Sequence, residues 1–145
     1  MPDLPSDPGH LIVSCDGAAR GNPGPAGIGA VVATDDGTIL AEIAEGIGET
    51  TNNVAEYRAM IAGLERAAEL GAGEVTVKSD SNLLVEQMNG RYRVKHPNLK
   101  PLYAEALGLA SRFERITYTH VRREFNTEAD RLANIGVDTW LARDR

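Results

Sequence analysis

The chain has 145 residues, of which 42% are hydrophobic and 25% charged, with a formal net charge of -6 at pH 7. These apolar side chains suffice for the core of one domain. A single cysteine, Cys15, excludes an internal disulfide, and three scattered histidines offer no spacing typical of a zinc site. No apolar run approaches the length of a membrane span, and the polar start differs from a signal peptide. We expect a cytoplasmic domain without structural metal or a membrane partner.

The acidic balance argues at first against a polyanionic partner, because proteins that bind nucleic acids usually carry excess positive charge. Net charge, however, is a sum over all faces of a molecule. If four acids were gathered round divalent cations, the remaining charge would be about -2, since -6 plus 4 is -2. A local basic strip could then face phosphates, and residues 89–100 supply one with four positive charges and no negative one.

The first third of the chain predicts an antiparallel meander. An apolar run ends at Asp16-Gly17, the pattern of a buried central strand. The glycine- and proline-rich stretch 21–29 predicts a turn, and Asp-Asp-Gly at 35–37 is a hairpin signal. The expected strands are 10–15, 28–34 and 38–46.

The rest of the chain alternates helical and strand patterns. The expected helices are 53–70, 82–88, 99–113 and 127–141, and the expected strands are 74–78 and 115–121. This order predicts an α/β fold with a five-stranded mixed sheet and helices on both faces. We expect residues 1–9 to be a disordered lead-in, 10–142 the domain, and 143–145 a C-terminal tail.

Four carboxylates fall at strand ends or in first helical turns: Asp16, Glu56, Asp80 and Asp130. Each has a structural explanation. Asp16 suits the exit of a strand into a glycine turn, and Asp80 suits the N-cap of a helix. Glu56 could complete a capping box with Asn53, and Asp130 stands at the third position after a capping threonine.

The joint placement of the four acids favours a metal site. Glu56 and Asp130 lie on the inward flanks of their predicted helices, where an unpaired charge is costly. Strand ends and first helical turns meet at the carboxyl edge of an α/β sheet. Acids gathered there would repel one another, and two divalent cations would balance their charge. Ligands that are all oxygen select Mg²⁺ or Mn²⁺ over zinc.

Four segments resemble the signature blocks of type 1 ribonuclease H. They are CDGAARGNPGPAGIGAVV (15–32), TTNNVAEYRAMIAGL (50–64), VKSDSNLLVEQMNGRY (77–92) and HVRREFNTEADRLAN (120–134). The similarity spans about residues 11–141. The chain is most similar to the N-terminal ribonuclease H domain of actinobacterial proteins that continue into a phosphatase domain.

The resemblance implies a ribonuclease H-like fold and an endonuclease that cuts the RNA strand of an RNA/DNA hybrid. It implies two Mg²⁺ or Mn²⁺ ions at Asp16, Glu56, Asp80 and Asp130, and products with 5′-phosphate and 3′-hydroxyl ends. We expect the domain to act as a monomer. Rival functions are a DNA-cutting or double-stranded-RNA-cutting nuclease of the same fold, a non-catalytic hybrid-binding module, or a structural domain of a larger phosphatase.

The resemblance also implies residues that contact the hybrid. Amides of the turn 17–21 and several asparagines would read the 2′-hydroxyls of the RNA strand, and Thr51 would receive a DNA phosphate. The implied contacts are Gly17, Asn22, Thr51, Asn52, Asn53 and Asn82. Two positions depart from the family pattern: Asn82 stands where many members have glutamine, and Glu49 where some have a phosphate-binding arginine. For Asn52 and Asn53, helix capping is the structural alternative.

The basic segment 89–100 occupies the place of a basic helical protrusion that grips the DNA strand in many family members. It is too short for that helix and contains a proline, so we expect a loop. Arg91, Arg93 and Lys95, together with Lys100, would contact phosphates. The alternative is a solvated basic loop with no ligand.

His120 has two interpretations. It lies ten residues before Asp130, the separation at which many family members place a histidine that helps proton transfer or product release. It also directly follows a predicted strand, so it could be the last residue of an exposed strand. In that second case Arg122 or Arg123 would serve the scissile phosphate.

Overall fold

The computed structural model describes residues 9–143, and this part of the chain contains five strands and four α-helices. The strands are β1 (His10–Ala19), β2 (Gly24–Thr34), β3 (Ile39–Thr50), β4 (Glu74–Ser79) and β5 (Arg115–His120). The helices are α1 (Asn52–Glu69), α2 (Asn82–Met88), α3 (Lys100–Ala110) and α4 (Thr127–Ala142), with a short 3-10 helix, η1 (Arg123–Phe125), before α4. The predicted order of strands and α-helices is confirmed. The expected lead-in and tail lie outside the described residues, except for Gly9 and Arg143.

β1 is the central strand of one sheet with the order β3-β2-β1-β4-β5. β2 pairs with β1 and with β3 in antiparallel fashion, whereas β4 runs parallel to β1 and β5 runs parallel to β4. The predicted mixed sheet is therefore confirmed. Because β1, β4 and β5 run in the same direction, their carboxyl ends meet at one edge, which is where α/β sheets place ligands.

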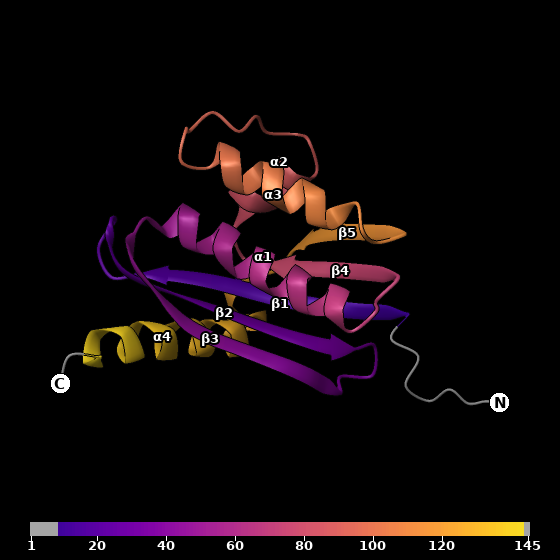
Figure 1. Cartoon of the computed structure of the whole chain (residues 1–145), viewed down its shortest axis with the longest axis horizontal. Helices are drawn as coiled ribbons and strands as arrows, with labels where there is room; N and C mark the ends of the chain where they lie inside the picture. The colour runs from indigo at the N-terminus through magenta and orange to yellow at the C-terminus, as the bar shows by residue number, and fades with distance from the viewer. Residues whose placement is uncertain (1–8, 144–145) are drawn as a thin grey trace.

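Helices cover both faces of the sheet, as predicted. Figure 1 shows α1 with α3 on one side and α4 on the other. Tyr57, Met60 and Leu64 of α1 pack in the main core with Leu11 and Val13 of β1. α4 covers β1, β2 and β3 on the opposite face. None of the described helices combines the length and the apolar character needed to cross a membrane.

Two glycines allow α1 and α4 to approach the strands closely. A Cβ at Gly17 would lie 2.3 Å from the backbone carbon of Ala55, in the first half of α1. A Cβ at Gly29 would lie 2.1 Å from the carbonyl oxygen of Ala129, in the first turn of α4. Contacts this short are possible only without a side chain. The glycines therefore bring the N-terminal turns of both helices against the centre of the sheet.

β1 is longer than predicted, because it continues from residue 15 to Ala19. Its parallel partner β4 stops at the pair Cys15–Ser79, but antiparallel pairing with β2 continues to Ala19–Ala26. The expectation that Asp16 ends the first strand was therefore wrong: Asp16 lies within β1, one residue beyond the end of β4.

Three other boundaries also differ from the predictions, and one is the end of β3, which continues to Thr50 and not to residue 46. β2 begins at Gly24, so the expected turn over 21–29 is limited to residues 20–23, and residues 17–19 belong to β1. Gly27 therefore lies in β2 and not in a turn, and both Gly27 and Gly29 admit the backbone of α4. α3 ends at Ala110, three residues before the predicted end.

The close packing at Gly29 predicts a large cost for adding a methyl group there. We expect Gly29→Ala to lower the free energy of unfolding by about 2 kcal/mol or more, because the Cβ would overlap the α4 backbone. Gly108→Ala is the control, since Gly108 lies in α3 with open space around its Cβ position, and it should raise stability by about 0.5 to 1 kcal/mol. Urea unfolding followed by circular dichroism measures both. Equal effects would contradict the packing argument.

Candidate active site

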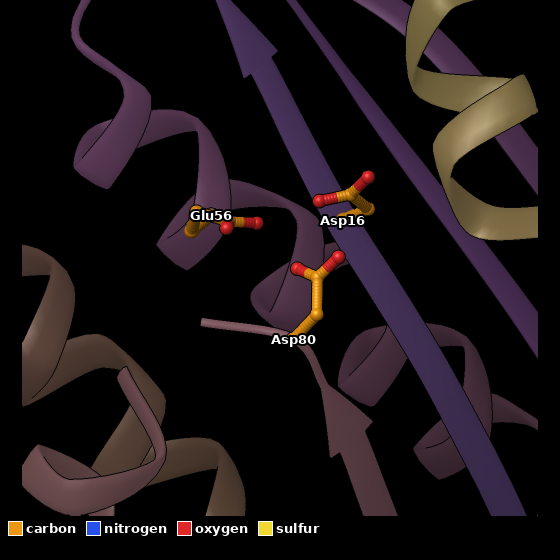
Figure 2. A group of neighbouring side chains, drawn as sticks. All are labelled: Asp16, Glu56 and Asp80. Carbon is orange, nitrogen blue, oxygen red and sulfur yellow. The ribbon is translucent and has the colours of Figure 1, made fainter. Parts of the chain in front are cut away.

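Three acidic side chains converge at the carboxyl edge of the sheet. Asp16 comes from β1, Glu56 from α1, and Asp80 directly follows β4. Each offers a carboxylate oxygen, and these oxygens lie within 4.8 Å of one another. Figure 2 shows the three side chains pointing toward a common centre. Because Asp16 is only 6% exposed, this group forms the floor of a pocket and not a surface patch.

The fourth predicted acid, Asp130, lines the same pocket from α4. The pocket has a volume of about 250 Å³. Asp130 is not a member of the close group of three, but its side chain is hydrogen-bonded to that of Asp16. The amide of Asn134, one helical turn later, donates to the Asp130 backbone carbonyl at 3.0 Å and reaches its carboxylate at 3.5 Å. All four predicted acids therefore face one pocket.

The capping explanations for these acids were wrong. α1 is capped by Thr51, whose hydroxyl accepts from Val54 N at 3.2 Å, so Glu56 lies beyond the first turn. α2 is capped by Ser81, not by Asp80. The N-cap position of α4 is Asn126, one residue before the expected threonine, and it makes no side-chain capping bond.

The backbone of β1 holds Glu56 directly. Gly17 N donates to Glu56 Oε1 at 2.6 Å, across the short distance between β1 and α1 that Gly17 itself permits. This hydrogen bond orients the Glu56 carboxylate beside Asp16 and Asp80. The same glycine therefore sets both the packing of α1 and the orientation of an acid.

The three acids are electrostatically coupled. Burial, followed by repulsion from Glu56 and Asp80, raises the pKa of Asp16 to about 9. Burial also raises the pKa of Glu56 to about 7, against the opposing effect of the Gly17 amide. Without cations, the group therefore retains protons at neutral pH. The same burial and the same acids raise the pKa of the Cys15 thiol.

This donor set fits hard divalent cations. The group offers only carboxylate oxygens, and neither histidine nor cysteine belongs to it. Mg²⁺ and Mn²⁺ prefer such ligands, whereas zinc sites in proteins usually include histidine or cysteine. Replacing shared protons by divalent cations would let all the acids ionise without mutual repulsion.

Arg123 and His120 occupy different positions relative to the acids. Arg123 of η1 lines the pocket, with Nε 3.9 Å from Asp80 Oδ2, and its side chain is 89% exposed. It can therefore reach an anion bound above the acids. His120 is the last, exposed residue of β5, paired with Ser79, and it does not line the pocket. Its position matches the exposed-strand interpretation, and its catalytic role stays a prediction.

The asparagines predicted to read the RNA strand join the turn after β1 to the start of α1. Asn52 Oδ1 accepts from Ala19 N at 3.0 Å, and Asn22 Oδ1 accepts from Asn52 N at 3.0 Å. Gly17 and Asn52 both line the acid pocket, so the rim formed by Asn22 and Asn52 borders the carboxylates. Asn82 is the exposed first residue of α2. Their contacts with a nucleic acid stay predictions.

The basic segment forms a loop between α2 and α3, as expected, with Lys100 as the first residue of α3. Arg91 forms a bidentate ion pair with Glu86, at 2.6 Å from Nη2 and 2.9 Å from Nε. The buried Gln87 accepts from the Tyr57 hydroxyl at 2.6 Å and donates to the Arg93 carbonyl at 3.4 Å. The loop is therefore anchored to the core.

A hollow of about 500 Å³ lies beneath this loop. Its lining includes Asn53, Gln87, Arg93, Lys95 and His96. Arg93 and Lys95 are exposed there, whereas the charge of Arg91 is balanced by Glu86. The sequence does not reveal the roles of Glu86 and Gln87, because neither the five-residue separation of Glu86 from Arg91 nor the contact of Gln87 with Tyr57 follows from a helical pattern.

Comparison with known proteins identifies close relatives of this chain. The family model described as "Reverse transcriptase-like" matches residues 14–136. The "Bifunctional protein Rv2228c" of Mycobacterium tuberculosis is 58% identical over 129 residues, which cover 88% of this chain and 35% of that protein. The chain thus spans about a third of that relative. "Ribonuclease HI" of Halobacterium salinarum is 42% identical over 134 residues, covering 92% of this chain and 67% of that protein.

Solved structures share the fold closely. The N-terminal ribonuclease H domain of Rv2228c, solved as a fusion with maltose-binding protein, aligns with a TM-score of 0.87 and 58% identity, covering 89% of this chain and 99% of that one. LC11-RNase H1, solved in complex with an RNA/DNA hybrid, aligns with a TM-score of 0.87 and 44% identity, covering 91% of this chain and 99% of that one. With its four acids facing one pocket at the sheet edge, the chain belongs to the ribonuclease H family.

Proposed function

We propose that this domain hydrolyses the RNA strand of RNA/DNA hybrids by two-metal-ion catalysis, leaving 5′-phosphate and 3′-hydroxyl ends. The observation that carries the proposal is the group formed by Asp16, Glu56 and Asp80, whose oxygens lie within 4.8 Å of one another, with Asp130 in the same pocket. The hybrid substrate is supported by LC11-RNase H1, a relative solved with a hybrid bound.

The four acids would hold two Mg²⁺ or Mn²⁺ ions. When bound, the ions supply an activated water, neutralise charge on the phosphate, and stabilise the departing 3′ oxygen. The protein's part is to hold the ligands in place. The Gly17 amide fixes Glu56, and burial in the sheet edge fixes Asp16. Arg123, the cation that lines the pocket, is placed to attract the phosphate of the bond that is cut.

The hybrid would lie across two neighbouring surfaces. The rim formed by Asn22 and Asn52 borders the acids and would read the 2′-hydroxyls of the RNA strand. The hollow beneath the basic loop would receive the DNA strand, with Arg93 and Lys95 on its phosphates. Asn53 lines this hollow and starts the same helix as Asn52, so α1 connects both surfaces.

The longer relative supports a second proposal about the full-length protein. The M. tuberculosis protein is named bifunctional, and this chain covers only 35% of its length. By family resemblance, we propose that a phosphatase domain follows the ribonuclease H domain in the full-length protein. That domain would act on its own substrate, because the acid pocket is built entirely within this chain.

Cleavage of a hybrid should require the acids and a divalent cation. We expect the parent to cut the RNA of a labelled hybrid in Mg²⁺ or Mn²⁺ and not in EDTA, and Asp16→Asn to lose at least about a thousandfold in rate because a metal ligand is removed. Asp36→Asn, in the exposed β2–β3 hairpin, is the control and should retain full activity. Gel assays on hybrid, double-stranded RNA, single-stranded RNA and DNA duplex separate the rival functions. Preferred cleavage of DNA duplex would refute the proposal.

The stability of the metal-free domain should fall as pH rises from about 4 to about 9. Over this range folded Asp16, with its pKa near 9, keeps a proton that the unfolded chain releases near its ordinary pKa of 3.8. Each unit of pH therefore favours the unfolded state. Asp16→Asn should flatten this dependence and raise Tm at pH 8 by about 3 °C or more.

Thermal melting in EDTA between pH 5 and pH 9 measures this effect. Adding Mg²⁺ at pH 8 should raise Tm of the parent and leave that of Asp16→Asn nearly unchanged, because the variant lacks a ligand. A parent whose Tm rises with pH in EDTA would show that the acids are not coupled as described.

Removing Arg93 and Lys95 from the basic loop should weaken the salt dependence of binding. We expect Arg93→Ala/Lys95→Ala to reduce the slope of log K against log salt by about 1.8, which is about 0.9 for each phosphate contact. Arg91→Ala should change the slope little, because Arg91 is already paired with Glu86. Arg112→Ala/Arg115→Ala removes the same charge away from the hollow and is the control. Fluorescence anisotropy in Ca²⁺ measures binding, and an equal effect of both double variants would refute a local contact.

A further inference from the structure

Arg20 connects the turn after β1 to one face of α4. Its Nη1 lies 2.7 Å from Asp138 Oδ1, and its Nη2 donates to Asn134 Oδ1 at 3.3 Å. Asn134 Nδ2 in turn donates to the Asp130 carbonyl at 3.0 Å and reaches its carboxylate at 3.5 Å. Residues 130, 134 and 138 are spaced four apart, so they stand one above another on the helix. A continuous series of polar contacts therefore runs from Asp138 through Arg20 and Asn134 to Asp130.

Arg20 and Asp130 together fix the orientation of the Asn134 amide. The guanidinium can only donate, so it must face the oxygen of the Asn134 amide. That constraint turns the amide nitrogen toward Asp130. The Asp130 carbonyl and carboxylate can only accept, so they select the same orientation from the other end of the amide. Asp138 holds the other end of the guanidinium, so the orientation is supported from both sides.

Asp130 is supported differently from Glu56. It is outside the group of three whose oxygens lie within 4.8 Å, and it receives no hydrogen bond from a strand backbone of the kind that Gly17 gives to Glu56. The amide of Asn134 donates to the Asp130 carboxylate, and the carboxyl group of Asp16 is also hydrogen-bonded to it.

We propose that Arg20 and Asn134 are positioning residues that hold Asp130 in place as a metal ligand. This inference rests on the proposed function of the site. Arg20 acts through Asn134 and does not itself touch the metal. Loss of either residue should raise the Mg²⁺ concentration for half-maximal cleavage by about tenfold, as is typical when a partner behind a metal ligand is removed. KM for the hybrid should stay unchanged.

A direct contact of Arg20 with the substrate is the competing explanation, because its side chain is 43% exposed. The two explanations predict different couplings. If Arg20 acts through Asn134, Arg20→Met should have no further effect once Asn134 has been replaced by alanine. If Arg20 binds a phosphate, Arg20→Met should raise KM equally with and without Asn134.

The experiment compares the parent with Arg20→Met, Asn134→Ala and the double variant. Arg66→Met is the matched control, because Arg66 is 47% exposed and is also paired with an acid, Glu69, on the far part of α1. Two quantities are measured: the Mg²⁺ dependence of hybrid cleavage, and the Mg²⁺ concentration that shifts the ¹³C NMR signal of the Asp130 carboxyl group. We expect both Mg²⁺ concentrations to rise about tenfold in the three site variants. Neither concentration should change in the Arg66→Met control.

Two outcomes would overturn the inference while leaving the proposed function intact. In the first, the parent cleaves hybrid, and the variants show the same Mg²⁺ dependence and the same Asp130 signal as the parent. The other is additive effects of Arg20→Met and Asn134→Ala. A parent that neither cleaves hybrid nor shifts the Asp130 signal in Mg²⁺ would refute the proposed function, and this inference with it.

Discussion

Repulsion among buried carboxylates is the constraint around which this domain is arranged. Asp16, Glu56 and Asp80 bring their oxygens within 4.8 Å at the edge of the sheet, where burial removes the water that would screen them. A flexible surface would let such groups separate. Here they cannot separate, because a strand, a helix and a strand end hold them. Without a cation, Asp16 and Glu56 therefore retain protons, and holding these acids together lowers the stability of the domain. A divalent cation would remove this cost.

Close backbone contacts and two hydrogen bonds between side chain and backbone hold this arrangement. Gly17 lets α1 approach β1 and then donates to Glu56. Gly29 gives α4 the same close approach on the other face. Buried Asn126, at the start of α4, donates to the Cys15 carbonyl at 2.9 Å, directly before Asp16. Each helix that carries an acid is therefore tied to β1 next to another acid.

The basic loop shows how tertiary contacts change the meaning of a charge pattern. The sequence presents Arg91, Arg93 and Lys95 as equivalent cations, and the loop itself was predicted correctly from its length and proline. In the structure Arg91 pairs with Glu86, five residues earlier and at the end of another element. Because this pair depends on how the chain turns after α2, no helical or strand period reveals it.

By itself, the sequence determined the order of strands and helices, the mixed sheet, and the four acids that face one pocket, because apolar periods and strand ends are local features. It misplaced the end of β1, since the continued pairing of Asp16 to Ala19 depends on β2 and not on the strand's own residues. Only the tertiary structure decided which three acids lie closest, that Asn134 connects Asp130 to Arg20, and that His120 stands outside the pocket. Those facts depend on helices packed at glycine contacts across the sheet, and residues distant in the chain set them.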